Sequence, residues 1–226
     1  MMKNKTELVK REFLTITDLH VREAGEGKQS RTIEGHAILF DTPSAPLWED
    51  DEEVAYEEIA PESVTREFLD GCDIKMTMFH DRQLILARSR NGAGTLSYDI
   101  DEKGVAFSFE APNTVDGDKA IELVKRGDIA GCSFMFTTKY WDEAYVSKTV
   151  TRENGKTIIR YRVNVMTGIY DFTLAADPAY PDTDVAQREL VAELRKPEQP
   201  AVDSKENENR MREQVQEMRR AAARML

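Results

Sequence analysis

Between Glu12 and Arg188 the chain is broken into many short stretches rich in β-branched and aromatic residues, with turn-forming residues between them. Stretches of this kind are typical of short β-strands, and helical patterns are few by comparison. The sequence therefore predicts a mainly β fold, an antiparallel barrel or sandwich with peripheral helices.

Turn signals set the limits of the predicted strands. Asn154-Gly155 is the strongest hairpin signal in the chain, and Asp101–Gly104 predicts a second hairpin. Gly35, inside the strand expected at 31–40, is interpreted as a β-bulge. The other predicted strands lie at 13–17, 73–79, 84–89, 93–100, 104–110, 131–141 and 165–175.

Three segments are expected to be helical. Residues 61–70 have a proline in the first turn and acidic residues early in the segment. The second helix is expected to begin at Asp116 as its N-cap and to end at Gly127. Residues 181–194 predict a further helix at the end of the β region.

Changes in composition divide the chain into three parts: a charged leader at 1–11, a folded domain at 12–195, and a linker with a charged tail at 196–226. Prolines at 197 and 200 mark the linker. The tail is rich in helix formers, and its apolar residues have the spacing of a coiled-coil seam. A partly disordered helical tail is the alternative. The residues of this seam are Met211, Val215, Met218, Ala222 and Met225.

Composition excludes several classes of function. The net charge of −11 argues against a nucleic-acid-binding surface, which requires clustered lysine and arginine. No apolar run approaches the ~20 residues of a membrane-spanning helix, and the N-terminus has no apolar export signal, so we expect a cytoplasmic protein without membrane contact. The two cysteines and three histidines are scattered without a metal-binding motif, so neither a metal nor another cofactor is expected.

Three segments place a polar, chemically capable residue within an otherwise apolar stretch: Met78–Asp81, Gly131–Phe134 and Tyr170–Thr173. They supply a histidine, a serine and an aspartate, which are the base, nucleophile and acid of serine-type acyl transfer. The order of the three in the chain is no obstacle, because such triads are defined by geometry.

Ser133 is the candidate nucleophile. Strand alternation puts Cys132 and Phe134 on one face, which we interpret as the core, and Ser133 on the other. The same alternation argues against Cys132 as a competing nucleophile. Gly131, on the same face as Ser133, leaves room for a substrate backbone. Taken alone, Ser133 would be read as a small polar residue on a half-exposed strand.

His80 is the candidate base, because the pKa of a histidine lies near neutrality. Asp171, inside a strand, is the candidate acid, since a buried carboxylate needs a partner and an imidazolium would provide one. A surface histidine is the alternative for His80. For Asp171 the alternatives are an exposed position on an edge strand or an ion pair with Arg160 or Arg162.

In their order and spacing, these segments resemble the caudoviral prohead serine proteases, the capsid-maturation enzymes of tailed phages and prophages. The resemblance extends over most of residues 12–190. Besides the segments around His80, Ser133 and Asp171, it is carried by residues 33–40, 58–63, 94–96, Trp141 and 178–181.

The resemblance implies a fold similar to that of the herpesvirus assemblin proteases, a β-barrel surrounded by helices. It implies His80 as the general base, Ser133 as the nucleophile and Asp171 as the third member of a triad. The herpesvirus enzymes have a second histidine as the third member, which keeps His36 and His20 open. Asp177, directly before Pro178, departs from the family pattern and competes with Asp171.

The expected function is therefore a serine endopeptidase of prohead maturation. The resemblance implies that its substrates are scaffold segments, the major capsid protein and the enzyme itself, that it associates with itself, and that it acts inside the assembling prohead in the bacterial cytoplasm. A non-catalytic assembly or scaffold protein is the alternative from another class, and a generic β-barrel binding module is a third.

Overall fold

The structure is a computed structural model, and it describes residues 9–16, 18–23, 25, 30–176 and 194–195. The chain divides into two compact units, residues 1–191 and 192–226. The helix predicted at 181–194 lies almost wholly outside the described residues, and the tail predicted at 196–226 lies outside them altogether. The following description concerns the first unit.

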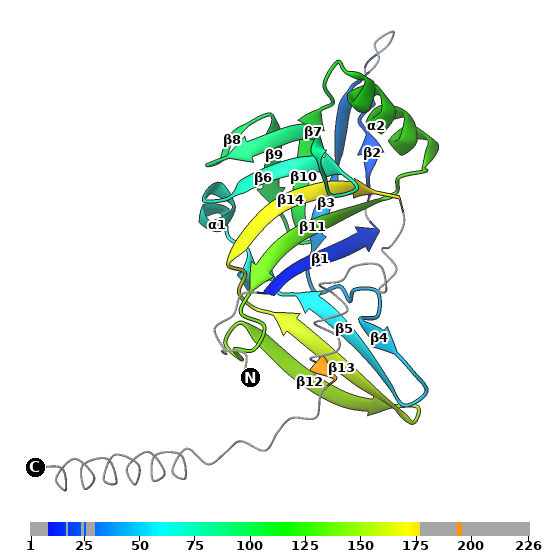
Figure 1. Ribbon diagram of the computed structural model, residues 1–226, viewed down its shortest axis with the longest axis vertical. Helices are drawn as coiled ribbons and strands as arrows, with labels where there is room; N and C mark the ends of the chain where they lie inside the picture. The colour runs from blue at the N-terminus through cyan, green and yellow to red at the C-terminus, as the bar shows by residue number, and fades with distance from the viewer. Residues whose placement is uncertain (1–8, 17, 24, 26–29, 177–193, 196–226) are drawn as a thin grey trace, which may run out of the picture. The chain divides into compact units, whose positions relative to one another are not determined.

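The first of three sheets formed by the described residues has six strands (Figure 1). In spatial order they are β1 (Val9–Ile16), β11 (Gly131–Thr138), β14 (Gly168–Ala175), β6 (Asp73–Met78), β7 (Asp81–Arg90) and β8 (Ala93–Gly94). Strands β14 and β6 run parallel, while the other neighbours are antiparallel. Strands β11 and β14 are therefore interior strands with a partner on each side.

The second sheet packs on the first, with β3 against β11 and β9 against β7. Its order is β2 (His20–Val21), β3 (Thr32–Leu39), β10 (Gly104–Glu110) and β9 (Leu96–Ile100). The rings of Phe107 on β10 and Phe172 on β14 lie 6.5 Å apart between the sheets. Each buried phenylalanine contributes roughly 2–3 kcal/mol by removal from water. Other fully buried residues of this core are Ile33, Ile74, Met76, Phe134 and Leu174.

The third sheet has the order β12 (Val146–Glu153), β13 (Lys156–Val163), β5 (Glu53–Ile59) and β4 (Trp48–Glu49). The predicted turn at Asn154-Gly155 is confirmed: both residues have positive φ, 51° and 85°, as a tight turn between twisted strands requires. The aromatic rings of Trp48 and Tyr140 both pack against that of Tyr161.

The helices are short and peripheral, as predicted. Residues 61–70 form two pieces, a 3₁₀ turn η1 (Pro61–Ser63) and α1 (Arg66–Asp70), because the backbone between them is extended at Val64. Helix α2 (Val115–Arg126) ends at Gly127 in the left-handed conformation, which confirms the predicted end. The predicted N-cap is wrong by two residues: Thr114, whose hydroxyl accepts from the Gly117 amide, caps the helix, and Asp116 lies in its first turn.

The bulge predicted at Gly35 is found two residues later. Val105 of β10 pairs with Ile38 and Ala106 pairs with His36, so Ala37 is the extra residue. Gly35 has a different role, because a Cβ at this position would lie 3.0 Å from the Leu19 Cα atom. The glycine therefore allows the segment around Leu19 to approach β3 closely.

The mainly β fold class with peripheral helices is confirmed, and most predicted strands are present. Strand β1 begins at Val9, within the segment predicted to be a leader. The strand predicted at 93–100 is divided into β8 and β9 on either side of Thr95. None of the helices in the described residues is both long and apolar enough to cross a membrane.

Candidate active site

Ser133 lies in the middle of β11, in a row of paired residues that crosses the first sheet. It pairs with Thr173 of β14, and Thr173 pairs with Thr77 of β6. Directly paired residues point to the same face of a sheet, so this row is polar. The other face carries Phe134 and Phe172 of the core. Ser133 and its apolar neighbours therefore point to opposite faces of the sheet, as predicted.

Asp171 lies on the same face as Ser133, because it precedes Thr173 by two residues. A bulge lies at Tyr170, immediately before Asp171 in the chain, because Met135 pairs with Asp171 but Phe136 pairs with Ile169. Asp171 is only 3% exposed and belongs to an interior strand, which rules out the edge-strand alternative.

The alternative ion pairs of Asp171 are also absent among the described residues, because the two arginines have other partners. Arg160 pairs with Glu58, and Arg162 pairs with Asp41, Glu58 and Glu62. The two arginines lie on β13 of the third sheet, and their partners lie on β5, in η1 and in the turn after β3. The buried carboxylate of Asp171 is instead satisfied within the first sheet.

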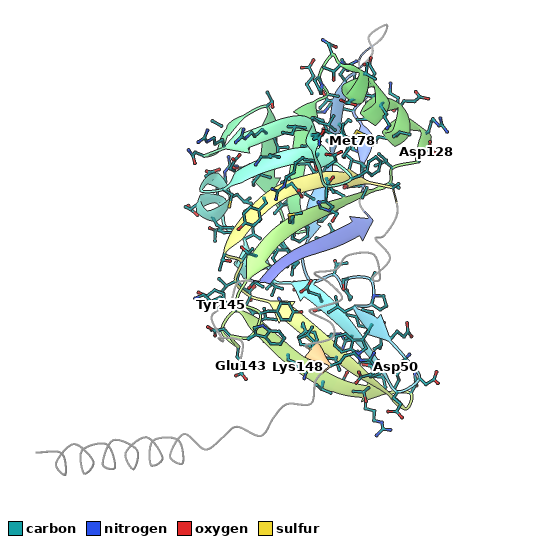
Figure 2. The ribbon with its side chains drawn as sticks, in the orientation of Figure 1. Asp50, Met78, Asp128, Glu143, Tyr145 and Lys148 are labelled. Atoms are coloured by element: carbon teal, nitrogen blue, oxygen red, sulfur yellow. The ribbon has the colours of Figure 1, made fainter. Side chains whose placement is uncertain are left out.

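His80 lies in the two-residue turn that joins β6 to β7. Figure 2 labels Met78, the last residue of β6, immediately before this turn. Phe79 and His80 have φ values of 56° and 54°. A two-residue turn between twisted strands requires such values, and asparagine and glycine usually provide them. Non-glycine residues in this region cost roughly 1–3 kcal/mol each, and such strain is found most often at functional sites.

The turn brings the imidazole of His80 between the two other candidates. Its Nδ1 atom lies 2.9 Å from Asp171 Oδ1, and its Nε2 atom lies 2.9 Å from Ser133 Oγ. In the tautomer that satisfies both contacts, Nδ1–H donates to the carboxylate and Nε2 accepts from the hydroxyl. Three residues from three separate segments thus form one chain of hydrogen bonds.

This arrangement has the geometry needed for nucleophilic acyl transfer. A hydroxyl and a base lie within hydrogen-bonding distance, and a carboxylate orients the far side of the base. Asp81, next to His80, does not take part in these hydrogen bonds. Its carboxylate accepts from the Gln83 amide at the start of β7.

The alternative histidines lie on the second sheet. His36 is bracketed by two carboxylates, with Nδ1 2.9 Å from Asp18 Oδ1 and Nε2 2.9 Å from Asp101 Oδ2. His20 contacts Glu34 through Nε2. The structure therefore brings neither histidine together with Ser133 and His80. Asp177, the other alternative, lies outside the described residues.

The contacts of His36 with Asp18 and Asp101, here called the His36 cluster, shift the pKa values of all three groups. Burial by itself lowers the pKa of His36, but hydrogen bonds to Asp18 and Asp101 outweigh it, and the pKa is raised. The hydrogen bond from His36 lowers the pKa of Asp101. Burial by itself raises the pKa of Asp18, but the hydrogen bond and the charge of His36, with smaller contributions from a backbone hydrogen bond and Lys103, together lower it. These contacts join β3 to the segment before β2 and to the turn between β9 and β10, which is a structural role.

Cys132 is fully buried on the core face of β11, as its place in the strand predicts. Burial raises the pKa of its thiol, which keeps the sulfur protonated and unreactive. Cys72 is half-buried, and burial raises its pKa as well.

Two residues near the site were missed by sequence reasoning. Thr173 and Thr77 are fully buried, and the Thr77 hydroxyl lies 2.9 Å from the Thr173 hydroxyl. The available signal was the spacing of Thr173 from Asp171, which puts two polar residues on one face of an apolar strand.

A cavity of about 370 Å³ lies elsewhere, on the second sheet. It is lined by residues of β2, β3, β9 and β10, among them Glu34, His36 and Ser108. None of the three candidate catalytic residues lines it. We place the candidate site at His80, because the chemistry and not the size of a hollow identifies it.

Comparison with known proteins adds independent information. The sequence profile of a family described as caudovirus prohead serine protease matches residues 17–197. Comparison with curated proteins gives no significant match. Among solved structures, the bacteriophage T4 capsid assembly protease, gp21, is similar with 10% sequence identity and a TM-score of 0.35; the match covers 72% of this chain and 98% of that one.

Proposed function

The chain belongs to the caudovirus prohead serine protease family and is a protease of phage capsid maturation, and we propose that it is a serine endopeptidase in which Ser133 is the nucleophile, His80 the general base and Asp171 the acid. The observation that carries the proposal is the pair of 2.9 Å contacts on opposite sides of the His80 ring. Family membership and site geometry are separate lines of support.

In the acylation step, Ser133 Oγ attacks the carbonyl carbon of the scissile peptide bond while His80 Nε2 takes the hydroxyl proton. The tetrahedral intermediate then collapses and the C–N bond breaks. His80 Nε2 returns the proton to the leaving nitrogen, which departs as the amine of the new N-terminus. The other half of the substrate remains as an ester of Ser133.

In the deacylation step, a water molecule replaces the departed amine. His80 Nε2 takes a proton from the water as its oxygen attacks the ester carbonyl, and it then gives a proton to Ser133 Oγ as the C–O bond breaks. The second product leaves as a carboxylic acid, and the serine hydroxyl is restored. The step consumes one water and needs no cofactor.

Asp171 acts through His80 in both steps. Its carboxylate accepts from Nδ1–H, which holds the ring in the tautomer whose Nε2 atom carries no proton and can take one from Ser133. It also stabilises the imidazolium that forms after the proton is taken. Because Asp171 is only 3% exposed, little water competes for this hydrogen bond.

The proposed substrates are scaffold segments and the major capsid protein, together with other copies of this chain. The proposed place of action is the interior of the assembling prohead in the host cytoplasm, where self-association brings protease and substrate together. The family's role in prohead maturation supports these substrates.

Co-expression with the major capsid and scaffold proteins of the same genome tests the proposal. We expect the wild-type chain to shorten at least one of them, and Ser133→Ala to leave their masses unchanged while it still assembles with them. An unchanged cleavage pattern with Ser133→Ala would reject the serine mechanism. The absence of cleavage by the wild type, with assembly intact, would favour a non-catalytic assembly protein.

A further inference from the structure

The main chain of His80 is held by a side chain from another strand. The His80 amide donates to Thr173 Oγ1 at 2.9 Å. The amide of the preceding residue, Phe79, donates to the Leu174 carbonyl at 3.1 Å. Two successive amides of the turn therefore bond to two successive residues of β14.

This turn needs such support because of its backbone conformation. Phe79 and His80 both lie in the left-handed region, which residues with a Cβ atom rarely occupy. Phe79 is 47% exposed, so packing contributes little to fixing its position. Hydrogen bonds from β14 are thus a main restraint on the main chain that carries the imidazole.

Thr173 is suited to hold the turn in place. It is fully buried on an interior strand, and its branched side chain has few accessible rotamers. Its Oγ1 atom accepts a second hydrogen bond, from the Thr77 hydroxyl at 2.9 Å, and Thr77 is also fully buried. The acceptor oxygen is therefore fixed by two hydrogen bonds, one from β6 and one from the turn that follows β6.

Thr173 also lies at the centre of the proposed catalytic residues. It is the cross-strand partner of Ser133, and it follows Asp171 by two residues on the same face. Strand β14 thereby contacts His80 twice: Asp171 binds the ring, and Thr173 binds the backbone.

We propose that Thr173 is a positioning residue, whose hydroxyl sets the His80 main chain so that the ring reaches Asp171 and Ser133 together. This inference rests on the proposed function. The competing explanation is that Thr173 is an ordinary buried threonine whose hydrogen bonds contribute to stability alone. The two explanations differ in what happens to the reactivity of Ser133 in protein that is still folded.

The test uses the full-length chain and a fluorophosphonate, in which Ser133 Oγ displaces fluoride from phosphorus, so that no natural substrate is needed. Thr173→Val keeps the shape of the side chain and removes the acceptor. We expect it to lower kinact roughly 10–100-fold, the size of effect that a misplaced catalytic group produces, and to leave KI within about twofold. Thr173→Ser, which keeps the acceptor, should recover most of the rate.

Thr138→Val is the matched control. Thr138 is also fully buried in the first sheet, and its hydroxyl donates to the Val165 carbonyl at 2.7 Å, on the core face of β11. It should lose stability as Thr173→Val does but keep the wild-type kinact. Rates are normalised to the folded fraction measured by circular dichroism.

Several results would overturn the inference. If Thr173→Val reacts like the wild type, or if Thr138→Val is slowed equally, Thr173 has only a structural role. Should Thr173→Val fail to fold, Thr173→Cys, whose sulfur is a poor acceptor, is judged by the same rates. If the wild type itself is not labelled at Ser133, the proposed function fails, and this inference fails with it.

Discussion

The Asp171 carboxylate and the His80 imidazole meet at 2.9 Å, although 91 positions separate them in the chain. The contact depends on two features of the first sheet: the parallel pairing of β14 with β6, and the tight turn that returns His80 over the sheet. It places the carboxylate on the side of the ring opposite Ser133. The choice of Asp171 as third member of the proposed triad depends on this contact.

Asp171→Asn is expected to lower kcat roughly 10²–10⁴-fold, because the amide no longer selects the required tautomer or stabilises the imidazolium. The measurement is the initial rate of cleavage of a protein substrate at neutral pH. Asp101→Asn is the matched control, since Asp101 also contacts a histidine, His36, but on the second sheet. If the Asp101 variant lost as much activity as the Asp171 variant, the assignment of Asp171 would be wrong.

Thiol reagents are expected to leave activity unchanged in the folded enzyme. Cys132 is next to Ser133 in sequence but faces the core, and burial raises the pKa of its thiol. Incubation with iodoacetamide at about pH 8, followed by an activity assay and peptide mass mapping, checks this. Inactivation that correlates with modification of Cys132 would show that Cys132 faces the active site and not the core.

Much of this site could be predicted from sequence, because alternation along a strand determines which residues share a face. The face of Ser133 was predicted in this way, and Asp171 was identified as a carboxylate inside an apolar strand. The third member of the triad could not be decided from sequence, since His36, His20 and Asp177 stay open beside Asp171 until the pairing of β14 with β6 is known. The support that Thr173 gives to His80 was also out of reach, because it depends on contact between a turn and a distant strand.

Two local predictions failed for physical reasons that sequence does not show. Asp116 and Thr114 are both good N-cap residues, and only the extended backbone at Thr114 decides between them. Gly35 was interpreted as a bulge because glycine is common there, whereas the close approach of Leu19 accounts for it.

The assignment of Thr114 as the N-cap of α2 can be tested by measuring the stability of variants. Thr114→Ala should lower the free energy of unfolding by about 1 kcal/mol, because the Gly117 amide loses its acceptor. For a domain of this size that corresponds to roughly 2–4 °C in Tm. Asp116→Ala should cost only a few tenths of a kcal/mol, since it loses only a favourable interaction with the helix dipole. Thermal denaturation of both variants checks the order, and the reverse order would restore Asp116 as the cap.

The His36 cluster predicts how stability changes with pH. The pKa of His36 is raised above its ordinary 6.5, so its contribution is complete below that pH and is lost as the pH rises through the folded-state pKa. The pKa values of Asp18 and Asp101 are lowered from 3.8, so their contribution is present above that pH and is lost on acidification. The cluster therefore stabilises the fold most between these limits.

Replacement of the histidine isolates this effect. In wild-type protein, Tm should fall as the pH is raised from about 6 to about 8.5, and His36→Gln should show a smaller fall over the same range. Because His36 is outside the proposed triad, the variant should keep its activity where it is folded. Equal pH dependence in both proteins would mean that His36 is not the titrating group.

The most direct test of Ser133 as the nucleophile of a self-cleaving protease is the intact mass of purified full-length chain, wild type beside Ser133→Ala, after incubation at high concentration. We expect the wild type to lose a terminal piece, whereas Ser133→Ala should stay whole alone and be cut when wild type is added. If Ser133→Ala alone were cut at the same bond and the same rate as the wild type, Ser133 would not be the nucleophile.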